Sequence, residues 1–437
     1  MADTELSRGK RIFQLVLLVL AAGSIYPLVY LRQNFETTIL TVYDLSQAEL
    51  AGLYSMLGIM FVVGYIPSGW LADRVNVKWL IIFSLLLTAA TGVVYAQIPD
   101  KSFLVYIYLV WGFATVFTFW SAILKTVSLL AGANEEGRYF GALDGGRGLV
   151  EAILASVAVG LFAFFSGGEG AGLTETTAGF QAVVYMYVAF ILLVALLLTF
   201  ILSSTVEERA EAKEKVVVES TYAAIRRIVK IPEVWLMIVV LFCGYVLFWG
   251  HYYFSGFLNV NHGVSPVAAG VVTVIVLWMR PVGGFGGGFL ADRFGKSKVL
   301  SISMFITSGA LVVLTLIPSG SMMWLVYATV VFAGLLMYVI RGVYWSLLED
   351  CRIPVVAAGI GIGFISFFGY LPDIIIPRIS EAIYNGFGDD VAGANNAFFV
   401  VTAAFGLVGA ITAAYFAMRM TKREKAEKGL KRTAVRS

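Results

Sequence analysis

The chain has 437 residues, of which 59% are hydrophobic and 14% are charged, and its mean hydropathy is +0.86. Soluble domains average about 45–50% apolar and about 25% charged residues, because a polar surface must cover their core. The composition therefore argues against a soluble enzyme, a disordered protein and a nucleic-acid binder, and the net charge of +3 is too small to indicate a nucleic-acid partner. It indicates a protein that crosses a membrane several times.

Cysteine and histidine are scarce, with two residues of each kind in the chain: Cys243, Cys351, His251 and His262. Both cysteines lie in apolar segments, which argues against a disulfide framework and against a zinc site. Two histidines cannot form a catalytic or metal-binding cluster. We therefore expect no metal, no cofactor and no enzyme activity.

A transmembrane helix needs about 20 mostly apolar residues. Twelve stretches of the chain meet this requirement, and their length and lack of alternation argue against strands. The predicted spans are residues 12–40, 48–70, 78–97, 103–130, 139–165, 179–203, 233–258, 265–289, 297–318, 322–347, 356–384 and 396–419. We therefore expect an all-α membrane protein with twelve transmembrane helices.

The basic residues concentrate on one side of the predicted membrane. With the N-terminus placed inside, 24 of the 31 lysines and arginines lie in the inner segments, whereas Lys101 is the single one in the outer loops. Cytoplasmic segments carry such an excess of positive charge. The pattern predicts an integral plasma membrane protein, in a bacterium an inner membrane protein, with both termini in the cytoplasm.

A charged segment divides the predicted spans into six and six. It covers residues 204–232 and is predicted to be a cytoplasmic linker with an amphipathic surface helix. The predicted domains are a six-helix bundle over 1–203 and a second six-helix bundle over 233–437, which ends in a basic tail.

The two halves also share a sequence motif. Gly69-Trp-Leu-Ala-Asp-Arg74 ends the second predicted helix, and Gly288-Phe-Leu-Ala-Asp-Arg293 ends the eighth, with their aspartates 219 residues apart. A weaker echo relates Phe119-Trp120-Ser121 to Tyr344-Trp345-Ser346. Two pseudo-symmetric six-helix halves around a central pathway are typical of transporters with parallel repeats.

The duplicated loop resembles the signature loop of the major facilitator superfamily. The resemblance covers the whole chain in topology, and it implies a transporter in which the loops act as gating latches through Asp73, Arg74, Asp292 and Arg293. The first copy departs from the family pattern at Asn76 and Val77, where the family usually has Gly and Arg. Plain positive-inside topology with a turn is the alternative interpretation.

Five arginines lie within predicted spans, where an ionisable side chain needs a partner or water: Arg32, Arg147, Arg280, Arg341 and Arg378. Asp144, Arg147 and Glu151 are spaced i, i+3, i+7, which puts them on one face of a helix. Guanidinium is a fixed charge with a fork of donors suited to carboxylate, phosphate or sulfonate. We interpret Arg32 and Arg147 as anion-binding, leave Arg341 open, and regard Arg280 and Arg378 chiefly as ion-pair partners.

A narrower resemblance supports an anionic substrate. The segment Tyr30-Leu-Arg32-Gln-Asn-Phe35 is similar to the first helix of the organophosphate–phosphate antiporter branch, and the segment from Glu136 through Arg147 resembles the same branch's loop into helix 5. The resemblance implies that Arg32 contacts a phosphate. The chain departs from the branch at Tyr65, where the branch has a Lys, and in the seventh span, which lacks the branch's second Arg. A carboxylate, a sulfonate or another organic anion is therefore an equal candidate.

The remaining candidate residues would couple transport to protons or line the pathway. Asp144, Glu151 and Asp373 are candidate proton acceptors, and His251 is a candidate relay, with static pairing as the alternative. The candidate substrate-binding residues are Arg32, Arg147, Arg341, Tyr30, Trp120, Trp249, Tyr344 and Tyr370. Packing is the alternative for the aromatic residues.

These patterns together predict a secondary active transporter for a small organic anion that works by alternating access, through proton symport or anion exchange. The alternatives are a sugar or drug/proton porter of the same fold and a transporter-like receptor. We expect a monomer in the lipid bilayer whose partner is a small anionic molecule.

Overall fold

The computed structural model of the chain describes residues 8–131, 136–167, 172–202, 221–319, 321–353 and 358–434. Within these ranges it describes all side chains except those of Ile66, Asp73 and residues 136–138, 221–224, 358–359, 424 and 426–434. Residues 204–220 of the predicted linker lie outside the described ranges.

The described residues form helices and no strand, and twelve helical segments are long and apolar enough to cross a membrane. This confirms the predicted fold class. The elements before the linker are α1 (Arg8–Val29), α2 (Arg32–Tyr43), α3 (Gln47–Arg74), α4 (Val77–Ala96), α5 (Lys101–Gly112), η1 (Phe113–Thr118), α6 (Trp120–Leu130), α7 (Glu136–Phe165) and α8 (Leu173–Ile201). Those after it are α10 (Thr221–Ile228), α11 (Pro232–Trp249), η2 (Gly250–Tyr253), α12 (Phe254–His262), α13 (Pro266–Phe294), α14 (Lys296–Leu316), α15 (Met323–Val343), η3 (Tyr344–Cys351), α16 (Ala358–Gly369), α17 (Pro372–Phe387) and α18 (Val391–Ala434).

Five of the spans are interrupted rather than continuous. The first span breaks between α1 and α2, the fourth passes through the π-helix η1, and the seventh and tenth pass through the 3₁₀ segments η2 and η3. The eleventh breaks between α16 and α17. In transporters, interrupted helices free backbone groups at the depth where substrates bind, so these breaks are candidate positions for a substrate site.

Local signals in the sequence explain where several helices begin. Before α3, the Ser46 hydroxyl accepts a hydrogen bond from the Glu49 N–H, and the Glu49 carboxylate accepts one from the Ser46 N–H at 2.8 Å. This capping box satisfies two N–H groups that the first turn leaves free. The Asp100 carboxylate caps α5 in a simpler way by accepting from the Ser102 N–H at 2.9 Å.

The two copies of the signature loop turn differently. In the second copy, Gly295 adopts a φ of 95° between α13 and α14, a conformation that favours glycine. In the first copy, Asn76 stands at this position with a φ of −54°, and its side chain caps α4 by accepting from the Lys78 N–H at 2.9 Å. The departure from the family pattern therefore replaces a left-handed glycine turn with an asparagine cap.

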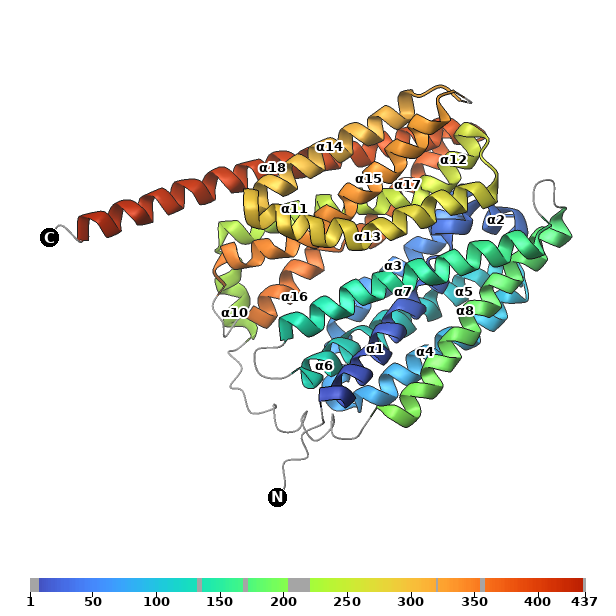
Figure 1. The fold of residues 1–437 in the computed structure, drawn as a ribbon, viewed down its shortest axis with the longest axis horizontal. Helices are drawn as coiled ribbons and strands as arrows, with labels where there is room; N and C mark the ends of the chain where they lie inside the picture. The colour runs from blue at the N-terminus through green and yellow to red at the C-terminus, as the bar shows by residue number, and fades with distance from the viewer. Residues whose placement is uncertain are drawn as a thin grey trace, which may run out of the picture. The chain divides into compact units, whose positions relative to one another are not determined.

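The chain divides into two compact units. Unit 1 comprises Met1–Val216, His251–Pro281 and Asp373–Asn395, and unit 2 comprises Val217–Gly250, Val282–Pro372 and Asn396–Ser437. Within unit 1, α4 packs beside α8 and α1 beside α7, and within unit 2, α14 packs beside α15 (Figure 1). These units are groups of residues in contact, whereas the domains of a transporter are the groups of helices that move together. The predicted bundles over 1–203 and 233–437 therefore stay a prediction.

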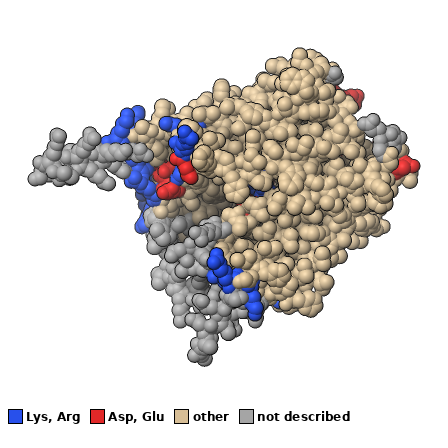
Figure 2. Space-filling view, viewed as in Figure 1, with Lys and Arg blue, Asp and Glu red and all other residues tan. Residues whose placement is uncertain are grey.

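The surface of the helices is largely apolar. Phe164, Phe200 and Phe285 are each about four-fifths exposed, as suits side chains that face lipid. In the face drawn in Figure 2, nearly all of the middle carries no charged residue, while the charged side chains gather towards its ends. This distribution fits a membrane protein whose loops lie in water.

Candidate functional site

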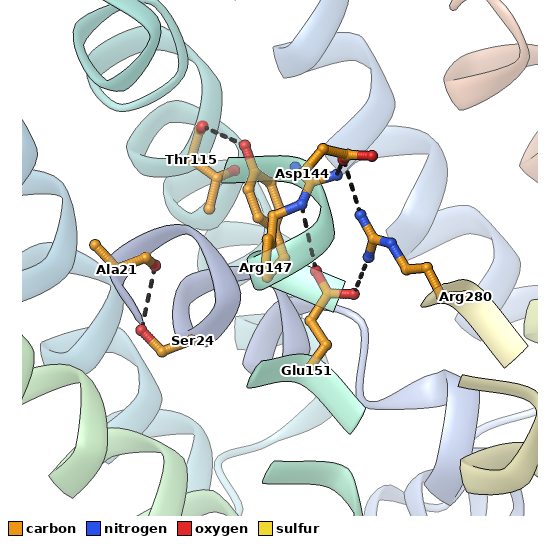
Figure 3. Close-up of polar contacts among 8 residues, drawn as sticks. Ala21, Ser24, Thr115, Asp144, Arg147, Glu151 and Arg280 are labelled. Carbon is orange, nitrogen blue, oxygen red and sulfur yellow. Dashed lines mark hydrogen bonds and ion pairs between the residues drawn. The ribbon is translucent and has the colours of Figure 1, made fainter. Parts of the chain in front are cut away.

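The central feature of unit 1 is a network of charged side chains on α7. Helical spacing puts Asp144, Arg147 and Glu151 on one face, as predicted, and Arg147 contacts both neighbours. Its Nη2 lies 3.2 Å from Asp144 Oδ1, and its Nε lies 3.6 Å from Glu151 Oε1. Arg147 is therefore paired with carboxylates of its own helix (Figure 3).

Arg280 of α13 completes the network. Its Nη1 donates to Glu151 Oε2 at 2.5 Å, and its Nη2 donates to Asp144 Oδ1 at 3.1 Å. Figure 3 shows this guanidinium reaching the two carboxylates from the side opposite Arg147. Two arginines and two carboxylates thus balance in charge, and the ion-pair interpretation of Arg280 agrees with these contacts.

The network is buried on one side and open on the other. The side chains of Arg147 and Arg280 are each 10% exposed and that of Glu151 is 15% exposed, whereas that of Asp144 is 65% exposed. Water and small solutes therefore reach the carboxylates from the side of Asp144.

Aromatic rings line the other flank of Arg147. Its guanidinium carbon lies 5.7 Å from the centre of the Tyr26 ring and 5.9 Å from that of Trp120. The Tyr26 hydroxyl donates to the backbone oxygen of Thr115, in the π-helix η1, at 3.1 Å. The interrupted fourth span thereby fixes Tyr26 and begins α6 at Trp120, so that both rings stand beside the arginine.

Arg32 occupies a second and fully buried site in unit 1. Its Nε donates to Glu36 Oε2 at 2.8 Å, and both side chains are 1% exposed. The Tyr253 ring centre lies 3.7 Å from the Arg32 guanidinium carbon, and the Tyr54 ring centre lies 5.7 Å away. Arg32, at the start of α2, is therefore enclosed by a carboxylate and aromatic rings.

Other predicted site residues of unit 1 lie at the breaks of the first, seventh and eleventh spans. Tyr30 stacks on Tyr252 with ring centres 5.0 Å apart, and the His251 ring centre lies 3.9 Å from that of Tyr252. Asp373 is buried in the first turn of α17, and His251 is also buried.

The predicted residues of unit 2 gather around aromatic rings. The Arg341 guanidinium carbon lies 4.2 Å from the Phe248 ring centre. Trp249 and Tyr344 are buried where α11 ends and η3 begins. Tyr370, between α16 and α17, accepts a hydrogen bond from Trp345 Nε1 at 3.0 Å. The structure thus places all of these residues at or beside helix breaks.

The predicted gating residues lie at the ends of α3 and α13. The Asp73 side chain is outside the described set, and Arg74 lies 4.5 Å above the Trp70 ring. Asp292 and Arg293 are exposed, with Arg293 5.4 Å from the Phe294 ring. No ion pair joins them in the described part of the chain, so their latch role stays a prediction.

Three contacts near these loops were not predicted from the sequence. Lys296 pairs with Glu349 in unit 2. In unit 1, Lys125 Nζ donates to the backbone oxygen of Ala72 at 3.0 Å, and Lys78 Nζ donates to that of Leu202 at 2.8 Å. No local pattern in the sequence signals these contacts, because each joins residues more than fifty positions apart.

Glu36 is the further site residue that the sequence reasoning missed. It lies four residues after Arg32, a spacing that brings the two side chains onto one helix face, and this signal was available.

The duplicated loop, the twelve spans and the charged network within them define a membrane transporter. The chain belongs to the Major Facilitator Superfamily, whose family model matches residues 12–377. Inner membrane protein YihN of Escherichia coli (strain K12) is 26% identical over 414 residues, which cover 94% of this chain and 96% of that protein. Inner membrane protein YqcE of the same organism is 24% identical over 379 residues, 84% of this chain and 86% of that protein.

Solved structures share the fold. A mutant of the nucleoside transporter NupG superposes with a TM-score of 0.71 at 15% identity and covers 92% of this chain and 99% of its own. A bacterial homologue of the human lysosomal transporter Spinster, in an inward-facing and occupied conformation, gives 0.70 at 17% identity, with 94% and 98% covered. These structures share the fold of this chain, and its membership of the Major Facilitator Superfamily makes it a membrane transporter that works by alternating access. Its relatives YihN and YqcE are inner membrane proteins.

Proposed function

We propose that this chain is a secondary transporter that carries a small organic anion together with a proton. The observation that supports this proposal is the balanced network of Asp144, Arg147, Glu151 and Arg280, which opens to solvent at Asp144. The substrate's negative group would be a carboxylate, a sulfonate or a phosphate ester held by Arg147.

Arg147 has the chemistry for this role. A guanidinium stays charged at any working pH and offers a fork of N–H donors to a planar or tetrahedral anion. The rings of Tyr26 and Trp120 beside it give the apolar part of an organic anion a surface to contact.

Charge balance supports proton symport over transport of the bare anion. Two arginines and two carboxylates are neutral as they stand, so an anion arriving at Arg147 leaves one unbalanced negative charge. An uncompensated charge in a buried site costs several kcal/mol. A proton taken up by Asp144 or Glu151 restores neutrality and also releases that carboxylate from Arg147. Anion and proton would therefore bind together and leave together.

A binding screen on the purified full chain in detergent tests the proposal. We would measure the melting temperature with glycerol 3-phosphate, citrate and ethanesulfonate, and with neutral glucose and cationic choline for comparison. A ligand that binds the folded state raises this temperature. We expect at least one anion to raise it, more strongly at lower pH, and neither glucose nor choline to do so.

Variants of Arg147 provide the control for specificity. Arg147→Gln should abolish the anion-induced shift, and so should the charge-balanced Arg147→Gln/Asp144→Asn, which guards against misfolding of the single variant. A shift with glucose or choline alone, no shift with any anion, or an unchanged anion shift in both variants would contradict the proposed function.

A further inference from the structure

The two arginines of the network do not share its carboxylates equally. Glu151 lies 2.5 Å from Arg280 and 3.6 Å from Arg147, measured between the nearest side-chain nitrogen and oxygen atoms. Asp144 lies 3.1 Å from Arg280 and 3.2 Å from Arg147. Arg147 Nε has no hydrogen-bond acceptor among the described residues. Glu151 is therefore drawn towards α13 while Asp144 is shared about equally, and Arg147 is the less saturated of the two guanidinium groups.

We propose that Arg280 is a positioning residue of the anion site. It holds Glu151 away from Arg147 and shares Asp144 with it, so that Arg147 keeps donors for the substrate. This inference rests on the proposed function and adds to it the residue that sets the affinity for the anion.

The geometry of the guanidinium suits Arg280 to this task. Its Nη1 binds one carboxylate and its Nη2 the other, so a single planar group bridges positions about two helix turns apart on α7. A lysine ammonium is a point charge without a fork and would not hold both carboxylates in this arrangement.

The sequence of α7 makes room for this bridge. A Cβ atom on Gly148 would stand 2.5 Å from Arg280 Cδ and 2.7 Å from its Nε, so that any side chain at this position would displace the arginine. Gly148 lies between the two carboxylates in sequence. The glycine therefore allows the Arg280 side chain to lie across the backbone of α7.

A second contact anchors the same two helices without touching the charges. Trp278 Nε1 of α13 donates to Ser156 Oγ of α7 at 3.2 Å. This contact provides a control, because removing it weakens the link between α7 and α13 but leaves all four charged groups in place.

Loss of Arg280 has a specific consequence under this proposal. Asp144 and Glu151 are the i−3 and i+4 neighbours of Arg147, so without Arg280 both turn to Arg147 and occupy its donors. The anion must then compete for the Arg147 donors with carboxylates that Arg280 no longer holds. Its affinity falls while Arg147 itself remains intact.

The test measures the dissociation constant of an anion probe on full-length variants. The probe is whichever of glycerol 3-phosphate, citrate and ethanesulfonate gives the largest thermal shift with the parent chain. We expect Arg280→Gln to weaken binding by about tenfold or more and Arg280→Lys by less, tenfold corresponding to about 1.4 kcal/mol. The double variant Glu151→Gln/Arg280→Gln leaves only Asp144 to compete for Arg147, and we expect it to bind the probe more tightly than Arg280→Gln. Trp278→Phe should bind like the parent chain.

The outcomes separate this inference from the proposed function. Unchanged affinity in Arg280→Gln, or weakened binding in Trp278→Phe equal to that in Arg280→Gln, would overturn the positioning role and leave the anion transporter standing. A double variant that binds the probe as weakly as Arg280→Gln would also overturn the positioning role. Both variants lack the bridge between α7 and α13, so equal losses would point to the bridge alone and not to the carboxylates that Arg280 restrains. Absence of any anion binding in the parent chain would instead remove the proposed function, and this inference with it.

Discussion

Arg32 and Glu36 form an ion pair in which both side chains are almost fully buried, with Arg32 Nε 2.8 Å from Glu36 Oε2. Neither Nη atom of Arg32 nor Oε1 of Glu36 has a hydrogen-bond partner among the described residues. The Tyr253 ring covers the guanidinium at 3.7 Å. Arg32 is the counter-charge that the buried Glu36 contacts, and aromatic rings cover the guanidinium, so each charge depends strongly on its partner.

Removing one member of this pair should destabilise the protein strongly. In Glu36→Gln the Arg32 charge stays buried without its counter-charge, and breaking a buried pair in this way costs about 3–5 kcal/mol. We expect a clear fall in the melting temperature of the purified variant. Arg378→Gln is the matched control, because the Arg378–Glu381 pair is 47% and 29% exposed and should contribute less than about 1 kcal/mol. Equal effects of the two variants would contradict the description of Arg32 as a buried site.

Gly58 marks a point of close helix contact inside unit 1. A Cβ atom there would clash with the backbone oxygen of Asp373, at the start of α17. Backbone atoms cannot rotate away, so Gly58→Ala must push α3 and α17 apart, at a cost of about 1–3 kcal/mol. Gly69→Ala on the same helix meets nothing within 4 Å and should be neutral or slightly stabilising. Comparison of the two melting temperatures tests this contact, and a stable Gly58→Ala would argue against it.

The pH dependence of anion binding should identify the proton acceptor. The open network makes Glu151 accessible through Asp144, whereas Asp373 is buried and has no ion pair with Arg147 among those described. We expect binding of the anion probe to strengthen as pH falls, because a protonated carboxylate no longer competes for Arg147. Glu151→Gln should flatten this profile, and Asp373→Asn should preserve it. The reverse result would transfer the coupling role to Asp373, which the sequence also offers as a candidate.

The orientation of the chain is a prediction from its basic residues. The inner segments defined by the positive-inside rule hold 24 of 31 lysines and arginines, which predicts a cytoplasmic C-terminus. Green fluorescent protein fused after Ser437 and expressed in bacteria should therefore fluoresce, while alkaline phosphatase at the same position should be inactive. An active phosphatase fusion with a dark fluorescent fusion would reverse the topology.

Hydropathy alone predicted most of the fold. The predicted span 78–97 corresponds to α4 (Val77–Ala96), and 139–165 lies within α7 (Glu136–Phe165). Ends were less accurate where a helix continues into water: the span predicted at 396–419 belongs to α18, which runs from Val391 to Ala434. The bilayer sets the length of an apolar run but not the point at which a polar extension stops being helical.

The helix breaks were not predicted, although they hold much of the candidate site. Residues 12–40 read as one apolar run, yet α1 ends at Val29 and α2 begins at Arg32. The polar residues Arg32-Gln-Asn that follow this break are too few to lower a hydropathy averaged over about 20 residues, so hydropathy did not detect it. Pro27 lies inside α1, close to the break, and was the available local signal.

The sequence by itself determined the twelve spans, the duplicated loop and the common face of Asp144, Arg147 and Glu151, because each span, each copy of the loop and this helix face is encoded in one short stretch of the chain. The tertiary structure decided which charges meet. Arg280 reaches Glu151 from 129 residues away, and Tyr253 covers Arg32 from a span on the other side of the linker. Such contacts depend on which helix faces pack together, and an apolar helix face gives no local sign of its neighbour. Among the five arginines within the predicted spans, Arg280 is thus shown by the tertiary structure to bridge two carboxylates.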